Sequence, residues 1–453
     1  MRKISVLLAL VYLVMAVMTA AAADFYVCAE RGGSGRSANG SKEQPFKDLQ
    51  AALDRANAGD TIRVAAGNYL GPNDRGYIVM DSTKPVSIIG GYSSDFNTRD
   101  VLKFQTKFQP TAASNDTMRS YALLNLGDIT KNVPINTGNG ITIDGLIFDK
   151  GFSNAYSPDK GKPAGVETGM YINPPGQGSN GTHQKITSVN MPCISYNTGA
   201  RGNLTIQNCV FVNGYHGIRG GTWATGNIKI NNCLFVGNLM AAVEIPGSVS
   251  GPTSHSTKVE FTNNTVLFTW SRTNELIDMG YGFRYMTGAS YDVDRCIIGF
   301  SVLSGLDRTR VESVAANEAK RQTNVTNTAF VLNRQGDIVL AVGGTFQQLR
   351  VHQFEDIDEK ILPKIDGNVA LGGELLKGKI NQAYLEGFLG MNFSQNVDLD
   401  RNSPANQFRS AFGMNLQATS TTKVDMFANR YPLEDALKLV GAVQGRGMQA
   451  IRN

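Results

Sequence analysis

Four charged residues of alternating sign recur in the middle of the chain, each at the end of a similar three-residue segment. The segments are Gly217-Ile218-Arg219, Ala242-Val243-Glu244, Gly282-Phe283-Arg284 and Gly305-Leu306-Asp307. We call these four charged residues the charged column, because stacking of the segments as neighbouring strands would bring opposite charges within ion-pairing reach. His216 and Tyr285 flank the column in sequence. Both a functional and a structural interpretation of this pattern are open.

The functional interpretation is a site for an acidic polysaccharide. β-Elimination in a uronic-acid chain needs a cation for the substrate carboxylate, a base for the C5 proton and an acid for the leaving oxygen. Arg219 and Arg284 are the candidate cations. His216 and Tyr285 are candidate catalytic groups for proton transfer.

Glu244 and Asp307 are candidates for acid–base work, and they are also the candidate metal ligands. Carboxylate oxygens bind Ca²⁺, which is therefore the candidate cofactor. In a hydrolase the same two carboxylates would act on either side of the scissile bond. The structural alternative is a salt-bridge ladder that stabilises neighbouring strands modestly. It predicts that exchanging the charges of Arg219 and Glu244 restores the stability lost when Glu244 alone is removed.

Each charged residue of the column follows one copy of an eight-residue repeat of apolar, any, apolar, polar, turn-forming, any and two apolar residues. The repeats are ITIDGLIF from Ile141, LTIQNCVF from Leu204, IKINNCLF from Ile228, VEFTNNTV from Val259, YDVDRCII from Tyr291 and TNVTNTAF from Thr323. Their alternation is typical of a short strand, and one such strand can bury its apolar face only by stacking on equivalent strands. We therefore expect an all-β protein built as a right-handed parallel β-helix.

Stacking of the coils would place residues at the same repeat position directly above one another. Asparagine recurs at the turn position of four repeats, where the side-chain amides could hydrogen-bond along the stack: Asn208, Asn232, Asn263 and Asn327. Cysteine recurs at the next position, at Cys209, Cys233 and Cys296. We interpret these three of the five cysteines as small buried side chains and not as halves of disulfides.

The two ends of the chain differ from the repeat. Residues 1–23 read as a signal peptide, with a basic start, an apolar run and a cleavage site near Ala23. The alternative, a membrane anchor, is disfavoured because the apolar run is short. An amphipathic helix over Pro45–Ala58 and a strand over Thr61–Ala65 are expected to form an N-terminal cap. Residues 24–345 then form the β-helix, and residues 346–453 form a C-terminal cap or small appended domain.

The composition and charge of the chain argue against several classes of ligand and location. The formal net charge of +5 among 453 residues, with no basic run, argues against nucleic acid. The four histidines lack the spacing of a zinc site. No segment after the signal peptide is apolar enough to span a bilayer, so we expect a secreted or cell-surface protein, or one of the bacterial periplasm.

The repeats and two N-terminal stretches, Pro45–Tyr69 and Val86–Asp100, resemble the pectin-lyase-like superfamily of right-handed parallel β-helices. The resemblance covers roughly residues 24–340 and implies the fold, but that superfamily contains lyases, hydrolases, epimerases and proteins without catalysis. The sequence lacks the paired aspartates of polygalacturonases, the Asp-Pro-His signature of alginate epimerases and the arginine motif of calcium-dependent pectate lyases. Two hypotheses follow: a protein that acts on or binds an acidic polysaccharide, with lyase as the enzymatic choice, and a non-catalytic adhesin or structural module of the cell surface or extracellular matrix.

Overall fold

The structure is a computed structural model of the whole chain. It describes residues 22–80, 84–110, 121–127, 136–151, 169–171, 191–270 and 280–301, residues 304–385 with short gaps, and residues 427–451. Nearly all of the predicted signal peptide lies outside the described residues. Within the described ranges, no helix is long and apolar enough to cross a membrane.

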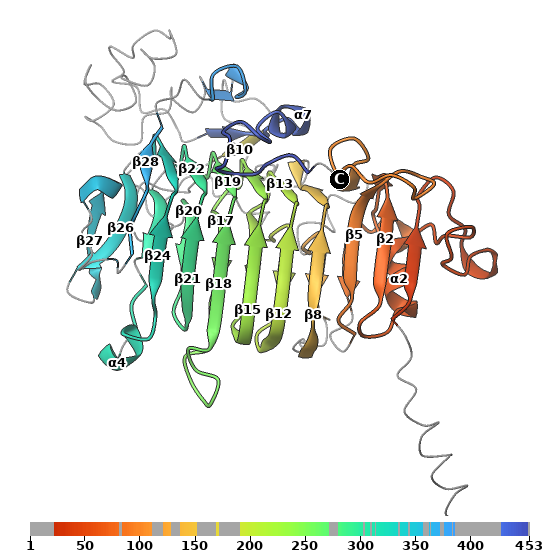
Figure 1. Cartoon of the computed structure of the whole chain (residues 1–453), viewed down its shortest axis with the longest axis horizontal. Helices are drawn as coiled ribbons and strands as arrows, with labels where there is room; N and C mark the ends of the chain where they lie inside the picture. Colours follow the sequence, from red (N-terminus) through yellow and green to blue (C-terminus); the bar gives the residue numbers. More distant parts are fainter. Residues whose placement is uncertain are drawn as a thin grey trace, which may run out of the picture.

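Three sheets run the length of the molecule, and each coil contributes one strand to each (Figure 1). Sheet A contains β1 (Asp24–Val27), β2 (Thr61–Ala65), β5 (Ser87–Tyr92), β8 (Asn136–Asp144), β12 (Ala200–Gln207), β15 (Trp223–Asn231), β18 (Thr257–Thr262), β21 (Ala289–Asp294) and β24 (Thr323–Thr326). Sheet B contains β3 (Gly67–Asn68), β6 (Thr106–Phe108), β9 (Ile147–Asp149), β13 (Val210–Val212), β16 (Leu234–Val236), β19 (Thr265–Leu267), β22 (Ile297–Gly299), β25 (Ala329–Val331) and β28 (Val369–Ala370). Sheet C contains β4 (Ile78–Met80), β7 (Leu124–Leu126), β11 (Ile194–Tyr196), β14 (His216–Gly220), β17 (Ala241–Ile245), β20 (Tyr281–Tyr285), β23 (Ser304–Arg308), β26 (Gly336–Val342) and β27 (Thr345–His352).

The strand order confirms the predicted right-handed parallel β-helix. Neighbours in each sheet come from successive coils and pair in parallel, except at the β26–β27 end of sheet C. The six repeats stack in register, with their first residues paired one above the next from Ile141 through Leu204 and onward to Thr323. Inside the coils, stacked rings of Phe148, Phe211 and Phe235 have centroids 5.2 and 4.7 Å apart.

The asparagine turns have the backbone conformation that the repeat requires. Asn208, Asn232, Asn263 and Asn327 all have φ between 50° and 56°, the left-handed region that asparagine tolerates. Asn232 Nδ2 donates to Asn208 Oδ1 at 2.8 Å, as predicted for a ladder. Asn263 instead donates to Asn231 Oδ1 at 3.1 Å, because a side chain on the adjacent strand offers a competing acceptor. The amide ladder is therefore confirmed only in part.

The cysteine prediction is confirmed. All five cysteines are free and buried, and Cys209, Cys233 and Cys296 belong to the interior core. The Cys233 thiol donates to Ile206 O at 3.7 Å, so a sulfur in this position uses a backbone acceptor of the coil below. Burial raises the pKa of Cys296 to about 12, which makes the thiolate scarce at neutral pH.

The N-terminal cap contains α2 (Leu49–Arg55), a shorter helix than the predicted Pro45–Ala58. It begins after Asp48, whose side chain accepts a hydrogen bond from Gln50 N at 2.8 Å and so caps the helix. It ends at Ala56, where the backbone becomes extended. The predicted strand Thr61–Ala65 is β2 with the same bounds.

The described C-terminal residues do not sit at the end of the solenoid. Residues 427–451, which include β29 (Phe427–Asn429) and α7 (Leu433–Leu437), run along the outer face of sheet B, as the dark blue ribbon of Figure 1 shows. Tyr431, Leu439 and Met448 join the outward-facing apolar residues of that sheet in a second core. The far end of sheet C is instead closed by β27, which pairs antiparallel with β26. Sheet B needs this cover because its outer face is apolar.

Candidate functional site

The charged column forms on the outer face of sheet C. Arg219 pairs in register with Glu244, Glu244 with Arg284, and Arg284 with Asp307, on β14, β17, β20 and β23. The residue before each of them belongs to the interior core: Ile218, Val243, Phe283 and Leu306. Because successive side chains of a strand point to opposite faces, the four charged side chains point out of the coil.

Each charged side chain of the column contacts one of opposite sign. Arg219 Nε lies 3.3 Å from Glu244 Oε1, and Glu244 Oε2 lies 3.5 Å from Arg284 Nη1. Arg284 Nε in turn lies 2.9 Å from Asp307 Oδ2. The column is therefore a continuous chain of ion pairs across four strands, as the structural alternative predicts.

Exposure falls steeply along the column. The Arg219 side chain is 39% exposed, whereas Glu244 is 7%, Arg284 2% and Asp307 0% exposed. A polymeric substrate can reach only the Arg219 end. The other three groups are shielded from solvent, so they cannot contact a polysaccharide in this conformation.

His216 joins the column through Glu244. Its Nε2 lies 3.5 Å from Glu244 Oε2, and the imidazole is fully buried. Burial lowers the pKa of His216, and the neighbouring carboxylate offsets this shift only in part, so the imidazole is neutral at pH 7. Burial by itself would raise the pKa of Glu244, but its contacts with His216, Arg284 and Arg219 outweigh burial and hold that pKa below its usual range.

Tyr285 does not belong to the site, and its predicted role in proton transfer there is wrong. It directly follows Arg284 on β20, so its side chain points to the opposite face and lies in the interior core. Its ring packs edge-on against Phe283 and Tyr291, with centroids 5.0 and 4.8 Å away. Burial raises the pKa of its hydroxyl well above the ordinary value.

A Ca²⁺ ion shared by Glu244 and Asp307 does not fit this arrangement. The two residues lie on strands separated by β20, and the Arg284 guanidinium sits between them in contact with both carboxylates. A cation already neutralises the pair, so a metal ion would have to displace a buried arginine. No group of three or more metal-binding side chains occurs among the residues that the structure describes.

The column continues beyond Arg219 with two residues that the sequence analysis missed. Ser195 on β11 pairs in register with Arg219, and Asn125 on β7 pairs with Ser195. Ser195 Oγ donates to Asn125 Oδ1 at 3.0 Å. Both residues follow an apolar residue at the same place in the coil, which is the available sequence signal, but neither carries the charge that identified the other four.

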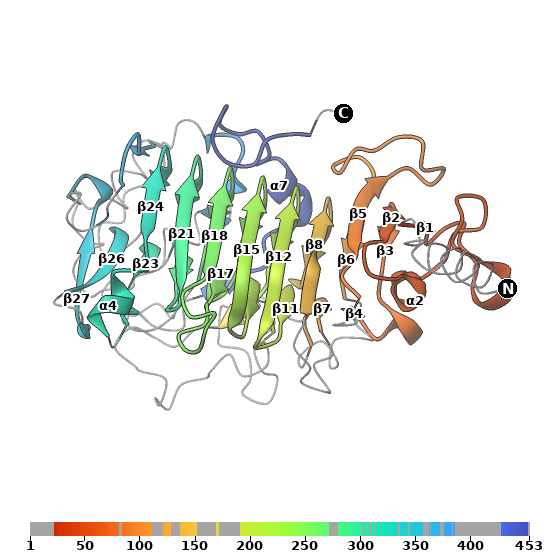
Figure 2. The ribbon, with the colours of Figure 1, turned by 60° about the horizontal axis from the view of Figure 1, so that its bottom comes forward.

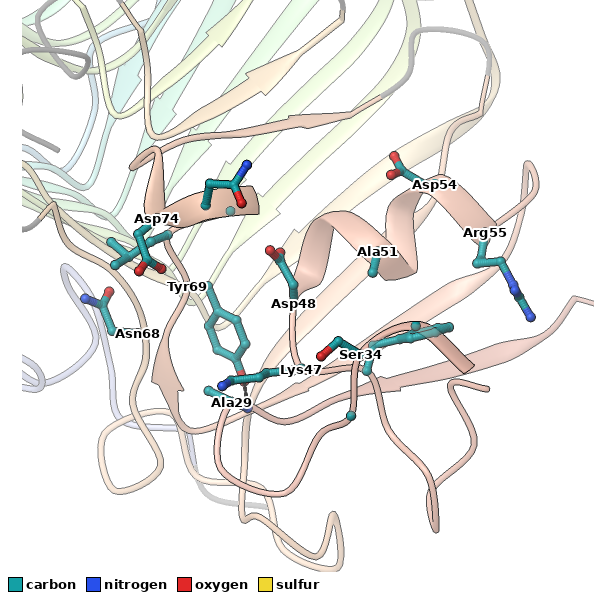
Figure 3. Close-up of a pocket in the computed structure, with 16 residues that line it drawn as sticks. Ala29, Ser34, Lys47, Asp48, Ala51, Asp54, Arg55, Asn68, Tyr69 and Asp74 are labelled. Carbon is teal, nitrogen blue, oxygen red and sulfur yellow. Dashed lines mark hydrogen bonds between the residues drawn. The ribbon is translucent and has the colours of Figure 1, made fainter. Parts of the chain in front are cut away.

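A separate pocket of about 630 Å³ lies at the N-terminal cap, between α2 and the loop that carries Asn68 to Asp74 (Figure 3). Asp48, Asp54 and Asp74 line it, together with the ring of Tyr69. Burial raises the pKa of Asp48, although its hydrogen bond from Gln50 N opposes that shift. None of the column residues lines this pocket, so it is not part of the predicted site.

These sheets place the protein in the class of right-handed parallel β-helix proteins, which confirms at the level of fold the resemblance to the pectin-lyase-like superfamily. Solved structures to which the chain is similar include pectate lyase Pel9A, with 15% sequence identity, a TM-score of 0.32 and coverage of 68% of this chain and 69% of that one. They also include a rhamnogalacturonan lyase (12%, 0.29, and 69% of each chain) and the rice weevil pectin methyl esterase (10%, 0.29, 75% of this chain and 90% of that one). No protein-family model and no curated protein sequence matches the chain.

Proposed function

We propose that the protein is an exported β-helix protein that binds an acidic polysaccharide without cleaving it, and that most of the charged column is structural. One observation carries this proposal: the column charges are paired with each other, and only Arg219 is substantially open to solvent. A catalytic acid or base must reach its substrate, whereas a ladder needs no access. The paired, buried arrangement fits the ladder.

Arg219 is the proposed contact for the polysaccharide. A guanidinium is planar and can donate two parallel hydrogen bonds to a carboxylate, which suits the acid group of a uronic-acid chain. In the described part of the chain, the Arg219 ion pair is made through Nε. The terminal nitrogens of this half-exposed side chain are therefore the groups offered to a ligand.

The test is affinity electrophoresis or calorimetry with polygalacturonate and alginate. Arg219→Ala should weaken binding about tenfold or more, the loss expected for one charge-assisted hydrogen bond. Arg201→Ala is the matched control, because Arg201 is exposed in the same coil but lies on sheet A. Absence of binding by the unaltered protein, or equal losses in both variants, would refute the proposal.

A polysaccharide lyase is the second candidate, favoured by the position of His216 and Glu244 next to Arg219. The imidazole, a carboxylate 3.5 Å from it and the accessible guanidinium are together the groups that β-elimination needs. This candidate requires the structure to open so that the buried His216 and Glu244 reach the substrate. The protein would be incubated with the same polymers and absorbance followed near 235 nm, with and without Ca²⁺. An increase that disappears in Glu244→Gln would favour the lyase, and a flat trace with retained binding would favour the non-catalytic protein.

Export to the periplasm, the cell surface or the medium remains part of the proposal. Ala23 N donates to Asp60 Oδ1 at 2.7 Å, and Thr61 N donates to Ala23 O at 2.9 Å, so Ala23 extends β1 by one residue. Cleavage before Ala23 would keep both bonds and place the new ammonium beside a carboxylate. Mass spectrometry of the exported chain should therefore find an N-terminus at or just before Ala23, earlier than the Asp24 that follows from a signal peptide of residues 1–23. A chain that retains residues 1–20 would contradict export by signal cleavage.

A further inference from the structure

Three connections between sheets C and A meet on one edge of the solenoid, and each directly follows a strand of the charged column, β17, β20 or β23. They are residues 246–256 after β17, residues 286–288 after β20, and the connection after β23 that includes α4 (Ala315–Glu318). In Figures 1 and 2 the first connection extends below β18, and the third, with α4, lies below β24 on the same edge. Gly247 N donates to Thr287 O at 2.9 Å, and a Cβ at Gly247 would lie 2.0 Å from Gly288 O. The close packing of these two glycines holds the first two connections together.

Ser254, His255 and Glu312 form a hydrogen-bonded series across these connections. Ser254 Oγ lies 2.5 Å from His255 Nδ1, and His255 Nε2 lies 3.0 Å from Glu312 Oε1. The imidazole is 2% exposed and the carboxylate 6% exposed, while Ser254 is partly open to solvent. Ser254 therefore ends, on a half-buried residue, a series whose other two side chains are buried.

The Glu312 carboxylate determines which atom donates in each hydrogen bond of this series. An ionised Glu312 can only accept, so His255 Nε2 must carry the proton of that hydrogen bond. In a neutral imidazole the other nitrogen, Nδ1, is then an acceptor, and the Ser254 hydroxyl donates to it. This is the arrangement of a serine activated by a histidine that a third group orients.

The carboxylate is itself held in place. Gly288 N donates to Glu312 Oε1 at 2.7 Å, and Glu312 N donates to Glu318 Oε2 at 3.0 Å. Glu318 is anchored by Arg308 and Arg321, each 2.7 Å from Oε1. His255 has φ 58°, in the left-handed region that few non-glycine residues adopt. Strained residues that the surrounding structure holds in place are concentrated at functional sites.

We propose that Ser254, His255 and Glu312 form a hydrolytic site for acyl esters. Ser254 Oγ attacks the ester carbonyl carbon while His255 Nδ1 takes the hydroxyl proton, and Glu312 stabilises the resulting imidazolium. The ester C–O bond breaks, the alcohol leaves with the proton from His255, and an acyl group remains on Ser254. Water then attacks the acyl carbon with His255 again as base, which releases the carboxylic acid and restores the serine. Because Ser254 lies on an open loop edge, the site suits an ester displayed on a large molecule, such as an O-acylated polysaccharide.

The direct test is covalent labelling of the full-length mature protein with a fluorophosphonate probe, followed by peptide mass spectrometry. The expected result is one label per chain, on Ser254, with hydrolysis of p-nitrophenyl acetate lost in proportion to labelling. His255→Gln should slow labelling about 100-fold or more, because the general base is removed. Glu312→Gln should slow it less, since the histidine remains.

Ser256→Ala is the matched control, because Ser256 is exposed two residues away and its hydroxyl donates to the backbone of Thr253 and Ala224. It should be labelled at the unaltered rate. Ser254→Ala should abolish labelling while the melting temperature shows that the chain is folded. Since labelling is mapped on the unaltered protein, the test does not depend on any variant folding. No label on Ser254, or equal labelling rates in the unaltered protein and His255→Gln, would overturn the proposal.

Discussion

Arg284 Nε lies 2.9 Å from Asp307 Oδ2, and neither side chain is more than 2% exposed. Removing two charges from water is costly, and only close pairing offsets that cost. Arg284 also lies 3.5 Å from Glu244, so its guanidinium contacts the carboxylates of both neighbouring strands, β17 and β23. This guanidinium is the centre of the ladder on sheet C.

Replacing Arg284 by Ala should destabilise the fold strongly. The change leaves Asp307 buried without its guanidinium, and breaking a buried ion pair typically costs about 3–5 kcal/mol. The free energy of unfolding would be measured by denaturant titration. Lys229→Ala is the control, since the exposed Lys229–Glu260 pair at 3.5 Å should contribute less than about 1 kcal/mol. Equal losses in the two variants would mean that the ladder does not stabilise the solenoid.

The double variant that exchanges Arg219 and Glu244 should not recover stability. The ladder predicted from the sequence considers Arg219 and Glu244 as a pair of their own. In the structure, Glu244 also contacts Arg284. An arginine at position 244 would place two guanidinium groups side by side in a buried site. We expect the exchanged variant to melt no higher than Glu244→Gln. Full recovery would show that the 219–244 contact is independent of Arg284.

Asp337 should make the protein less stable as the pH rises. Burial raises its pKa from 3.8 to about 6, although Asn333 and the N–H of Phe354 donate to it. The folded state therefore keeps a proton that the unfolded chain loses above pH 4. The contribution of Asp337 to stability is complete below about pH 4, declines between pH 4 and 6 and is lost above pH 6, a change of about 3 kcal/mol. Asp337→Asn should remove this part of the pH dependence, and an identical profile in that variant would exclude Asp337 as its source.

Leu439→Ala should weaken the whole solenoid although Leu439 is near the C-terminus. Its side chain is fully buried in the second core on sheet B, where truncating a leucine costs about 2–5 kcal/mol. Leu437→Ala, on the same segment but only partly buried, should cost clearly less. Unfolding would be followed by the far-ultraviolet signal of the sheets. A separate early transition in Leu439→Ala would indicate that residues 427–451 unfold independently.

Much of the fold was predictable because its signals are local. The alternation within Leu204–Phe211 and the asparagine at its turn specify a strand, its inner face and a left-handed residue without reference to distant parts of the chain. The glycine or alanine two residues before each charge then aligns Arg219, Glu244 and Arg284, although the connections between them differ in length. The same alternation would have placed Tyr285 on the inner face had it been applied to that strand, so this error was avoidable.

The sequence alone determined the coil, the register of its repeats and the order of charges along sheet C, since these depend on a two-residue period and on the chain's own turns. Tertiary structure decided what those charges can do. Burial depends on segments far away in sequence, and it leaves Arg219 open while enclosing Asp307. Tertiary structure also brought Ser254 and His255 to Glu312, 57 residues beyond His255. The repeat pattern does not predict the contact between His255 and Glu312, because that contact depends on how connections of unequal length fold against one another.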